Sequence, residues 1–109
     1  YQTAADMGVL AIGVDSNQNY MQPGTMLTSM YKKVGLAAYN SFAAAVAGNW
    51  EAGFSVNGVA EDGVGAAMDE YNADLVSADM LAAVDAARAA IISGDIVVHD
   101  YMSDNSCPL

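Results

Sequence analysis

The feature that most constrains this chain is an unbroken apolar run that ends on a carboxylate. Residues 9–14 read VLAIGV, and Asp15 follows them directly. Polar and apolar side chains do not alternate in the run, which is typical of a strand buried on both faces of a mostly parallel sheet. In α/β proteins, ligands bind at the carboxyl ends of such strands. The run therefore predicts a buried strand and makes Asp15 a candidate ligand-binding residue.

A long helix is predicted after this strand. Residues 27–47 carry apolar side chains at helical spacing, Thr25 or Thr28 is placed to cap the start, and Gly48 follows the end. A short helix is also expected before the strand, ending at Gly8 as a glycine cap. No helix-start signal precedes it, so we expect the sequence to be a fragment or a processed piece of a longer protein.

A second long helix has the clearest boundaries. Ser77 is its expected N-cap, Asp79 lies in its first turn, and Gly94 ends it. Its expected buried face consists of Met80, Leu81, Val84, Ala87, Ile91 and Ile92.

Two further elements are predicted around these helices. Residues 53–59 and 64–68 flank an Asp62-Gly63 turn signal and predict a hairpin. A short strand is expected over residues 96–98. The order of elements indicates part of an α/β fold, a mostly parallel sheet flanked by helices. Residues 1–99 are expected to form one lobe segment, and residues 100–109 a polar tail.

Charge restricts the partners of this chain. It has 13 acidic and 3 basic residues and a formal net charge of -10, so its surface would repel nucleic acids and anionic membranes. Cys107 is the single cysteine and cannot form an internal disulfide. We expect no cofactor, because a zinc site needs more than the lone His99, and DSNQNY departs from the calcium-loop pattern. We expect no catalytic residue and no metal ligand.

Lys32 and Lys33 are two of the three cations in the chain, and both are expected in the early turns of the first long helix. Lysine is unfavourable there, because a helix N-terminus carries partial positive charge. A ligand or a carboxylate partner would explain the placement, and Asp15 is separated from the helix by a single loop. A carboxylate and an ammonium in one crevice suit a neutral polar ligand, such as a sugar diol with a carbonyl or a ring nitrogen. Two structural alternatives stay open: Asp15 caps a turn, and the lysines are solvated.

Four stretches taken in order resemble a known family. They are AIGVDSNQ, PGTMLTSMYKKVGLAAYNSF, DGVGAAMDEYN and AARAAIISGDIVV. Together they are similar to the C-terminal part of the basic membrane protein family, the substrate-binding lipoproteins of ABC transporters that are related to bacterial purine nucleoside receptors. The resemblance extends to about His99.

The resemblance implies the C-terminal portion of a type I periplasmic-binding-protein fold, incomplete as a chain. It also implies that Asp15 faces the ribose hydroxyls and Lys32 the purine, whereas Lys33 lies outside the motif. The implied partners are a purine nucleoside or nucleobase, an ABC permease and the remaining N-terminal portion of the protein. That portion would carry a lipid anchor, at the periplasmic or cell-surface side of a membrane.

Three function classes follow. The first is a non-enzymatic solute receptor for an ABC importer, and the second is a sensory module of the same fold that signals to a partner protein. A nucleoside hydrolase is the third and is disfavoured, because the sequence offers neither a metal cluster nor a pair of carboxylates to activate water. The faces meant for absent segments would be exposed, so we expect self-association or co-purification with the remainder.

Overall fold

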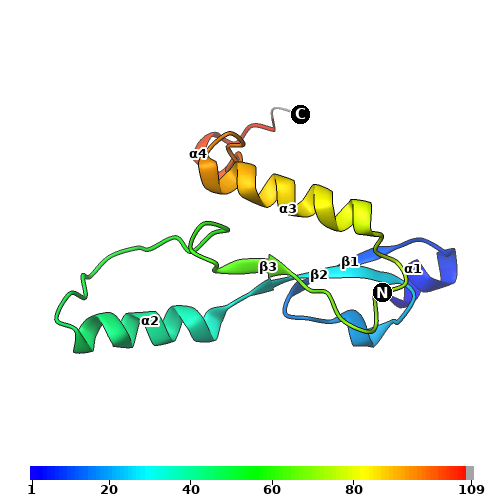
Figure 1. Cartoon of the computed structure of the whole chain (residues 1–109), viewed down its shortest axis with the longest axis horizontal. Coiled ribbons are helices and arrows are strands. Elements are labelled where there is room, and N and C mark those ends of the chain that lie inside the picture. Colours follow the sequence, from blue (N-terminus) through cyan, green and yellow to red (C-terminus); the bar gives the residue numbers. More distant parts are fainter. Residues whose placement is uncertain (108–109) are drawn as a thin grey trace.

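The computed structural model describes residues 1–107 and contains a three-stranded sheet with helices on its flanks (Figure 1). Pro108 and Leu109, the end of the expected tail, lie outside the described residues. The strand order is β1-β2-β3. β1 (Ala11–Asp15) pairs in parallel with β2 (Met26–Lys32), and β3 (Val64–Ala66) pairs antiparallel to β2. The sheet is therefore mixed rather than mostly parallel. The predicted apolar strand is present as β1, but it lies at the edge of the sheet with Ile12 and Val14 half exposed, so the prediction that it is buried on both faces is wrong.

The first long helix begins later than predicted. Residues 26–32 form strand β2, and the helix is α2 (Val34–Val46). The prediction of a helix from residue 27, capped by Thr25 or Thr28, is wrong. The segment contains Thr28 and Tyr31, residue types that suit strands, and pairing with β1 on one side and β3 on the other outweighs the helical spacing of its apolar residues.

The other two predicted helices are confirmed. α1 (Gln2–Met7) ends at Gly8, which has φ 67° and adopts the left-handed conformation that glycine tolerates. α3 (Ala78–Ser93) begins after Ser77, whose hydroxyl accepts a hydrogen bond from the Met80 amide at 3.2 Å. The residue after α3, Gly94, is also left-handed.

The predicted hairpin and the last predicted strand are wrong. Residues 53–59 form no strand, and β3 pairs with β2 instead. The turn signal itself is correct, since Asp62 has φ 56° and the Gly63 amide donates to the Gly58 carbonyl at 2.8 Å. Residues 96–98 lie exposed outside the sheet, because no strand in the described part of the chain runs beside them. Two short helices that were not predicted are η1 (Asn19–Met21) and α4 (Tyr101–Asp104), the latter inside the expected tail.

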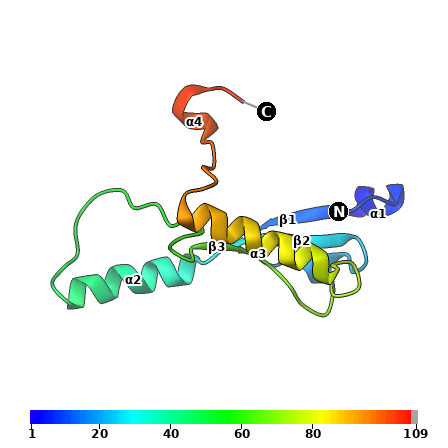
Figure 2. The ribbon, with the colours of Figure 1, turned by 45° about the horizontal axis from the view of Figure 1, so that its top comes forward.

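Helix α3 runs over one face of the sheet, as both views show, whereas α2 extends away from it (Figures 1 and 2). An apolar groove lies between α3 and the sheet, where Val84 and Ile91 of the helix oppose Ile12 and Met30. The predicted helix face thus points toward the sheet. It is not buried, because Met80, Leu81, Val84 and Ile92 each keep 39–51% of their surface exposed.

The apolar core is small for a chain of this length. Met26 and Ala67 are the buried hydrophobic residues of the described part, and Phe42, Val46 and Phe54 are largely exposed. The accessible surface is 7952 Å², about 2,300 Å² more than a compact monomer of this mass exposes. The radius of gyration is 16.9 Å, against about 13 Å for a compact domain of this length. The chain therefore exposes more surface than a compact monomer does, and many large apolar side chains lie on that surface.

We expect the isolated chain to self-associate through this surface. The edge strand β1 presents Ile12 and Val14, which are 57% and 50% exposed, and an apolar edge of this kind promotes strand pairing. Sedimentation velocity from low to high micromolar concentration should show species larger than a monomer. Ile12→Lys combined with Val14→Lys should reduce them, and a parent chain that stays monomeric over the whole range would contradict the expectation.

Candidate functional site

Asp15 and Lys32 form an ion pair at one edge of the sheet. Each is the last residue of its strand, and the parallel pairing of β1 and β2 brings the two carboxyl ends together, with Asp15 opposite Tyr31. The Lys32 Nζ lies 2.6 Å from Asp15 Oδ1. The side chains keep 53% and 69% of their surface exposed, respectively. An exposed pair contributes at most about 1 kcal/mol to stability, so a ligand could redirect both groups at little cost.

The proximity of these two residues was predicted, but for a different reason. The prediction placed Lys32 at the start of a helix, whereas it ends a strand adjacent to that of Asp15. Asp15 also has φ 75°, a left-handed conformation that aspartate adopts more readily than most residues. Strained conformations of this kind occur often at ligand sites, and here the conformation directs the chain out of β1.

A buried polar cluster holds the loop that follows Asp15. Asn19 and Ser29 are both completely buried. The Ser29 hydroxyl donates to Asn19 Oδ1 at 2.8 Å and accepts from the Gln18 amide at 3.0 Å. Gly13 makes room for it, because a Cβ at that position would lie 2.5 Å from Ser29 Oγ. The loop between β1 and β2 is therefore fixed to the sheet directly behind the strand end that carries Asp15.

The segment after β3 completes this cluster. Asn72 is 1% exposed, and its Nδ2 donates to the Leu27 carbonyl at 2.9 Å and to the Ala67 carbonyl at 3.0 Å. Asp69 accepts from Asn17 at 2.6 Å and from Asn19 at 3.2 Å. No buried side-chain nitrogen or oxygen in the described residues lacks a hydrogen-bond partner. The cluster thus connects three separate segments of the chain with satisfied hydrogen bonds.

The hydrogen bond from Asn17 holds the pKa of the Asp69 carboxyl below its usual value, and the bond from the Tyr71 amide acts in the same direction. Asp69 is not among the site residues predicted from the sequence. The sequence signal for this cluster is the polar run DSNQN, which departs from the calcium-loop pattern. Its asparagines instead bond to protein groups.

Lys33 makes a separate contact from Lys32. Its Nζ lies 2.5 Å from Asp62 Oδ2, and Arg88 of α3 binds Asp62 Oδ1 at 3.1 Å. These two cations hold the pKa of the Asp62 carboxyl below its usual value, chiefly through the hydrogen bond from Lys33. All three cations of the chain are therefore paired with carboxylates.

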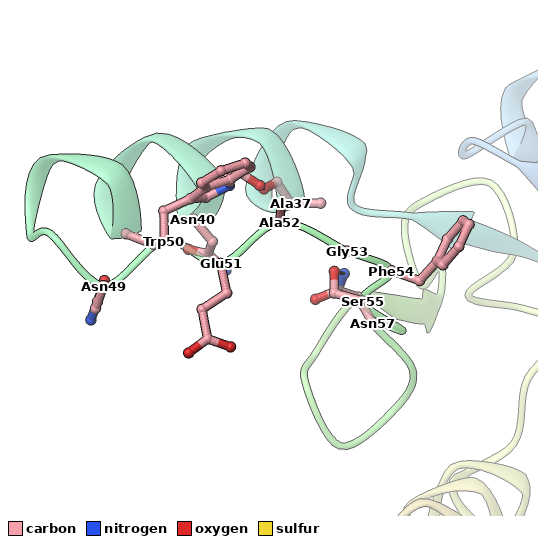
Figure 3. Close-up of a pocket in the computed structure, with 12 residues that line it drawn as sticks. Ala37, Asn40, Asn49, Trp50, Glu51, Ala52, Gly53, Phe54, Ser55 and Asn57 are labelled. Carbon is pink, nitrogen blue, oxygen red and sulfur yellow. Dashed lines mark hydrogen bonds between the residues drawn. The ribbon is translucent and has the colours of Figure 1, made fainter.

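A hollow of about 410 Å³ lies elsewhere in the molecule, between α2 and residues 49–57 (Figure 3). Trp50 and Asn40 line it, and Phe54 at its other end is fully exposed to solvent. Neither Asp15 nor Lys32 borders this hollow. It is bordered by residues 49–57, which form neither helix nor strand, and its lining residues do not form a recognisable catalytic or metal-binding group.

No protein-family model matches the sequence, and no curated protein is similar to it. Among solved structures, the chain is similar to one described as ABC transporter system solute-binding proteins from Aeropyrum pernix K1, with a TM-score of 0.62 and 24% sequence identity. The similarity covers 92% of this chain and 36% of that chain, so the sequence spans about a third of the matched protein. The chain thus shares its fold with part of that solute-binding protein.

None of the helices within residues 1–107 has the length and hydrophobicity needed to cross a membrane. The longest, α3, has 16 residues, whereas a spanning helix needs about 20.

Truncation of the buried amide at the centre of the cluster should destabilise the fold. Asn19→Ala leaves the buried Ser29 hydroxyl without an acceptor for its hydrogen and removes one donor from the Asp69 carboxylate, at a cost of about 1–3 kcal/mol. Urea unfolding measures the change. Asn49→Ala removes an exposed amide and is the matched control, with an expected change below about 0.5 kcal/mol. Equal effects of the two substitutions would contradict the role of the cluster.

Asp69 should make the fold sensitive to acid. Because folding lowers its pKa, its contribution to stability is fully present above a pH of about 4 and is lost as the pH falls through the lowered value. An NMR titration of the Asp69 carboxyl carbon should give a midpoint below the usual aspartate value. Asp69→Asn should flatten the dependence of the unfolding free energy on pH in this range, and a midpoint at or above the usual value would contradict the prediction.

Proposed function

We propose that this chain is part of a non-enzymatic solute receptor, and that Asp15 and Lys32 bind the solute. The observation that carries the proposal is their 2.6 Å contact at the carboxyl ends of two adjacent parallel strands. Ligands of open α/β sheets bind at this edge. The shared fold with part of an ABC transporter solute-binding protein supports the same assignment.

The charges of the pair favour a neutral polar solute. One carboxylate and one ammonium compensate each other, so a charged ligand would leave one charge unmatched. The Asp15 carboxylate can accept two hydroxyl hydrogens from a diol, and the Lys32 ammonium can donate to a carbonyl or a ring nitrogen. Each such charge-assisted bond contributes about 1.5–3 kcal/mol once water is excluded.

A purine nucleoside fits this arrangement, with its ribose diol at Asp15 and its base at Lys32. The family resemblance of GVDSNQ and LTSMYK supports this choice of ligand. In this proposal the receptor works outside the cytoplasm, anchored by lipid through its N-terminal portion, and delivers its ligand to an ABC permease. In this proposal a further part of the receptor covers the exposed side of Asp15, in keeping with a matched protein that is far longer than this sequence.

Ligand-induced stabilisation tests the proposal. Thermal unfolding is followed with millimolar inosine, guanosine, adenosine, adenine or ribose. A ligand at about a hundred times its Kd should stabilise the fold by about 2.7 kcal/mol. We expect nucleosides to raise the melting temperature and ribose not to do so.

Asp15→Asn is the informative variant, because asparagine tolerates the left-handed conformation of this position while losing the charge. It should abolish the nucleoside shift and leave the melting temperature without ligand nearly unchanged. Asp6→Asn, an exposed carboxylate of α1, is the matched control and should retain the shift. A nucleoside shift that survives Asp15→Asn would refute the site, and no shift in the parent would refute nucleoside binding by this chain.

A further inference from the structure

Two adjacent lysines bind to two different carboxylates in this structure. Lys32 pairs with Asp15, and Lys33 pairs with Asp62 at 2.5 Å. The Lys33 ammonium also lies 6.0 Å from the centre of the Tyr31 ring, and its side chain is 31% exposed, against 53% for Lys32. The two neighbouring ammonium groups are therefore held at different carboxylates, that of Lys32 at Asp15 and that of Lys33 at Asp62.

Asp62 is positioned by the turn that precedes β3. The Gly63 amide closes this turn on the Gly58 carbonyl at 2.8 Å, and the Gly63 carbonyl accepts from the Lys33 amide at 2.8 Å. The turn is thus fixed to residue 33 through the backbone as well as through the Asp62 side chain. Arg88 of α3 binds Asp62 Oδ1 at 3.1 Å, whereas Lys33 binds Oδ2, so the two cations use different oxygens of the carboxylate.

We propose that Asp62 is a positioning residue that determines ligand specificity: it holds the Lys33 ammonium so that Lys32 alone faces a ligand at Asp15. This inference rests on the proposed function. Lys32 and Lys33 border the same small hollow, together with Val34 and Asn57. Without Asp62, the Lys33 ammonium would have no carboxylate partner.

The consequence is a change in the charge of ligand that the site prefers. With Lys33 held by Asp62, the Asp15–Lys32 pair is balanced and suits a neutral ligand. A released Lys33 would add a positive charge beside the site and favour a ligand that carries an anionic group. Asp62 therefore excludes anionic relatives of a neutral ligand without touching the ligand itself.

Amine labelling tests the positioning without any ligand. The chain has three amino groups, those of Lys32, Lys33 and the N-terminus, and the N-terminus serves as the internal reference. Asp62→Asn keeps the shape of the side chain, and asparagine tolerates the left-handed backbone at this position. Acetylation followed by mass spectrometry should show Lys33 reacting about two- to fivefold faster in this variant, with Lys32 unchanged. An unchanged rate at Lys33 would overturn the proposal.

Two further variants separate this effect from a general loosening of the turn. Glu61→Gln removes an equal charge from the same turn, at a side chain that accepts from the Gly58 amide rather than from a lysine. Arg88→Gln detaches α3 from Asp62 but leaves Asp62 free to bind Lys33. Both should leave Lys33 protected. Equal acceleration in either variant, or acceleration of Lys32 as well, would overturn the role of Asp62.

Binding of adenosine and of adenosine monophosphate then tests the effect on specificity. In Asp62→Asn, the affinity for the monophosphate relative to adenosine should rise about tenfold, as expected for one added charge-assisted contact. An unchanged ratio would overturn the specificity role. If the parent binds neither compound, the proposed function fails for this chain, and the labelling rates still decide whether Asp62 holds Lys33.

Discussion

The hydrogen bonds of Asn19 and Ser29 are the contacts on which the rest of this structure depends. Both side chains are completely buried, whereas the buried apolar residues of the described chain are Met26 and Ala67. A core this small supplies little hydrophobic stabilisation. The polar cluster fixes the geometry instead, because each of its buried groups needs a specific partner and each partner comes from a different segment. It holds the loop after β1 against β2, and so determines where β1 ends and where Asp15 lies.

Parallel pairing then explains why a carboxylate ends this apolar strand. β1 and β2 run in the same direction, so their last residues meet at one edge, and Asp15 and Lys32 come within 2.6 Å. Chemistry at this edge requires groups that the fold does not need for its own stability. An exposed ion pair meets that requirement, whereas the buried amides behind it do not. The site and the cluster are therefore adjacent but have separate tasks.

Local signals in the sequence predicted local features well. Gly8, Ser77 and Gly94 mark helix ends by backbone preferences that act over a few residues, and all three are confirmed. Residues 27–32 were predicted wrongly, because their helical spacing is a local property and their pairing with β1 and β3 is not. The proximity of Asp15 and Lys32 could be predicted because a single loop joins the strand of Asp15 to the element that carries Lys32. Such a loop limits the distance between the two residues. The burial of Asn19 was not predictable from spacing, since its partners lie 10, 48 and 50 residues away.

The exposed apolar surface and the solvent-exposed site would both benefit from additional polypeptide that covers them. Asp15 keeps 69% of its side-chain surface exposed, and in water its hydrogen bonds to a solute would compete with those of the solvent. A second surface that closed over this edge would exclude that water and strengthen each contact. The chain also exposes about 2,300 Å² more than a compact monomer, and apolar residues such as Phe42, Val46 and Phe54 are largely exposed. Additional polypeptide that covered the apolar faces of β1 and α2 would stabilise the fold, and the same polypeptide could supply the missing wall of the site. Folding and ligand binding would then both depend on that cover.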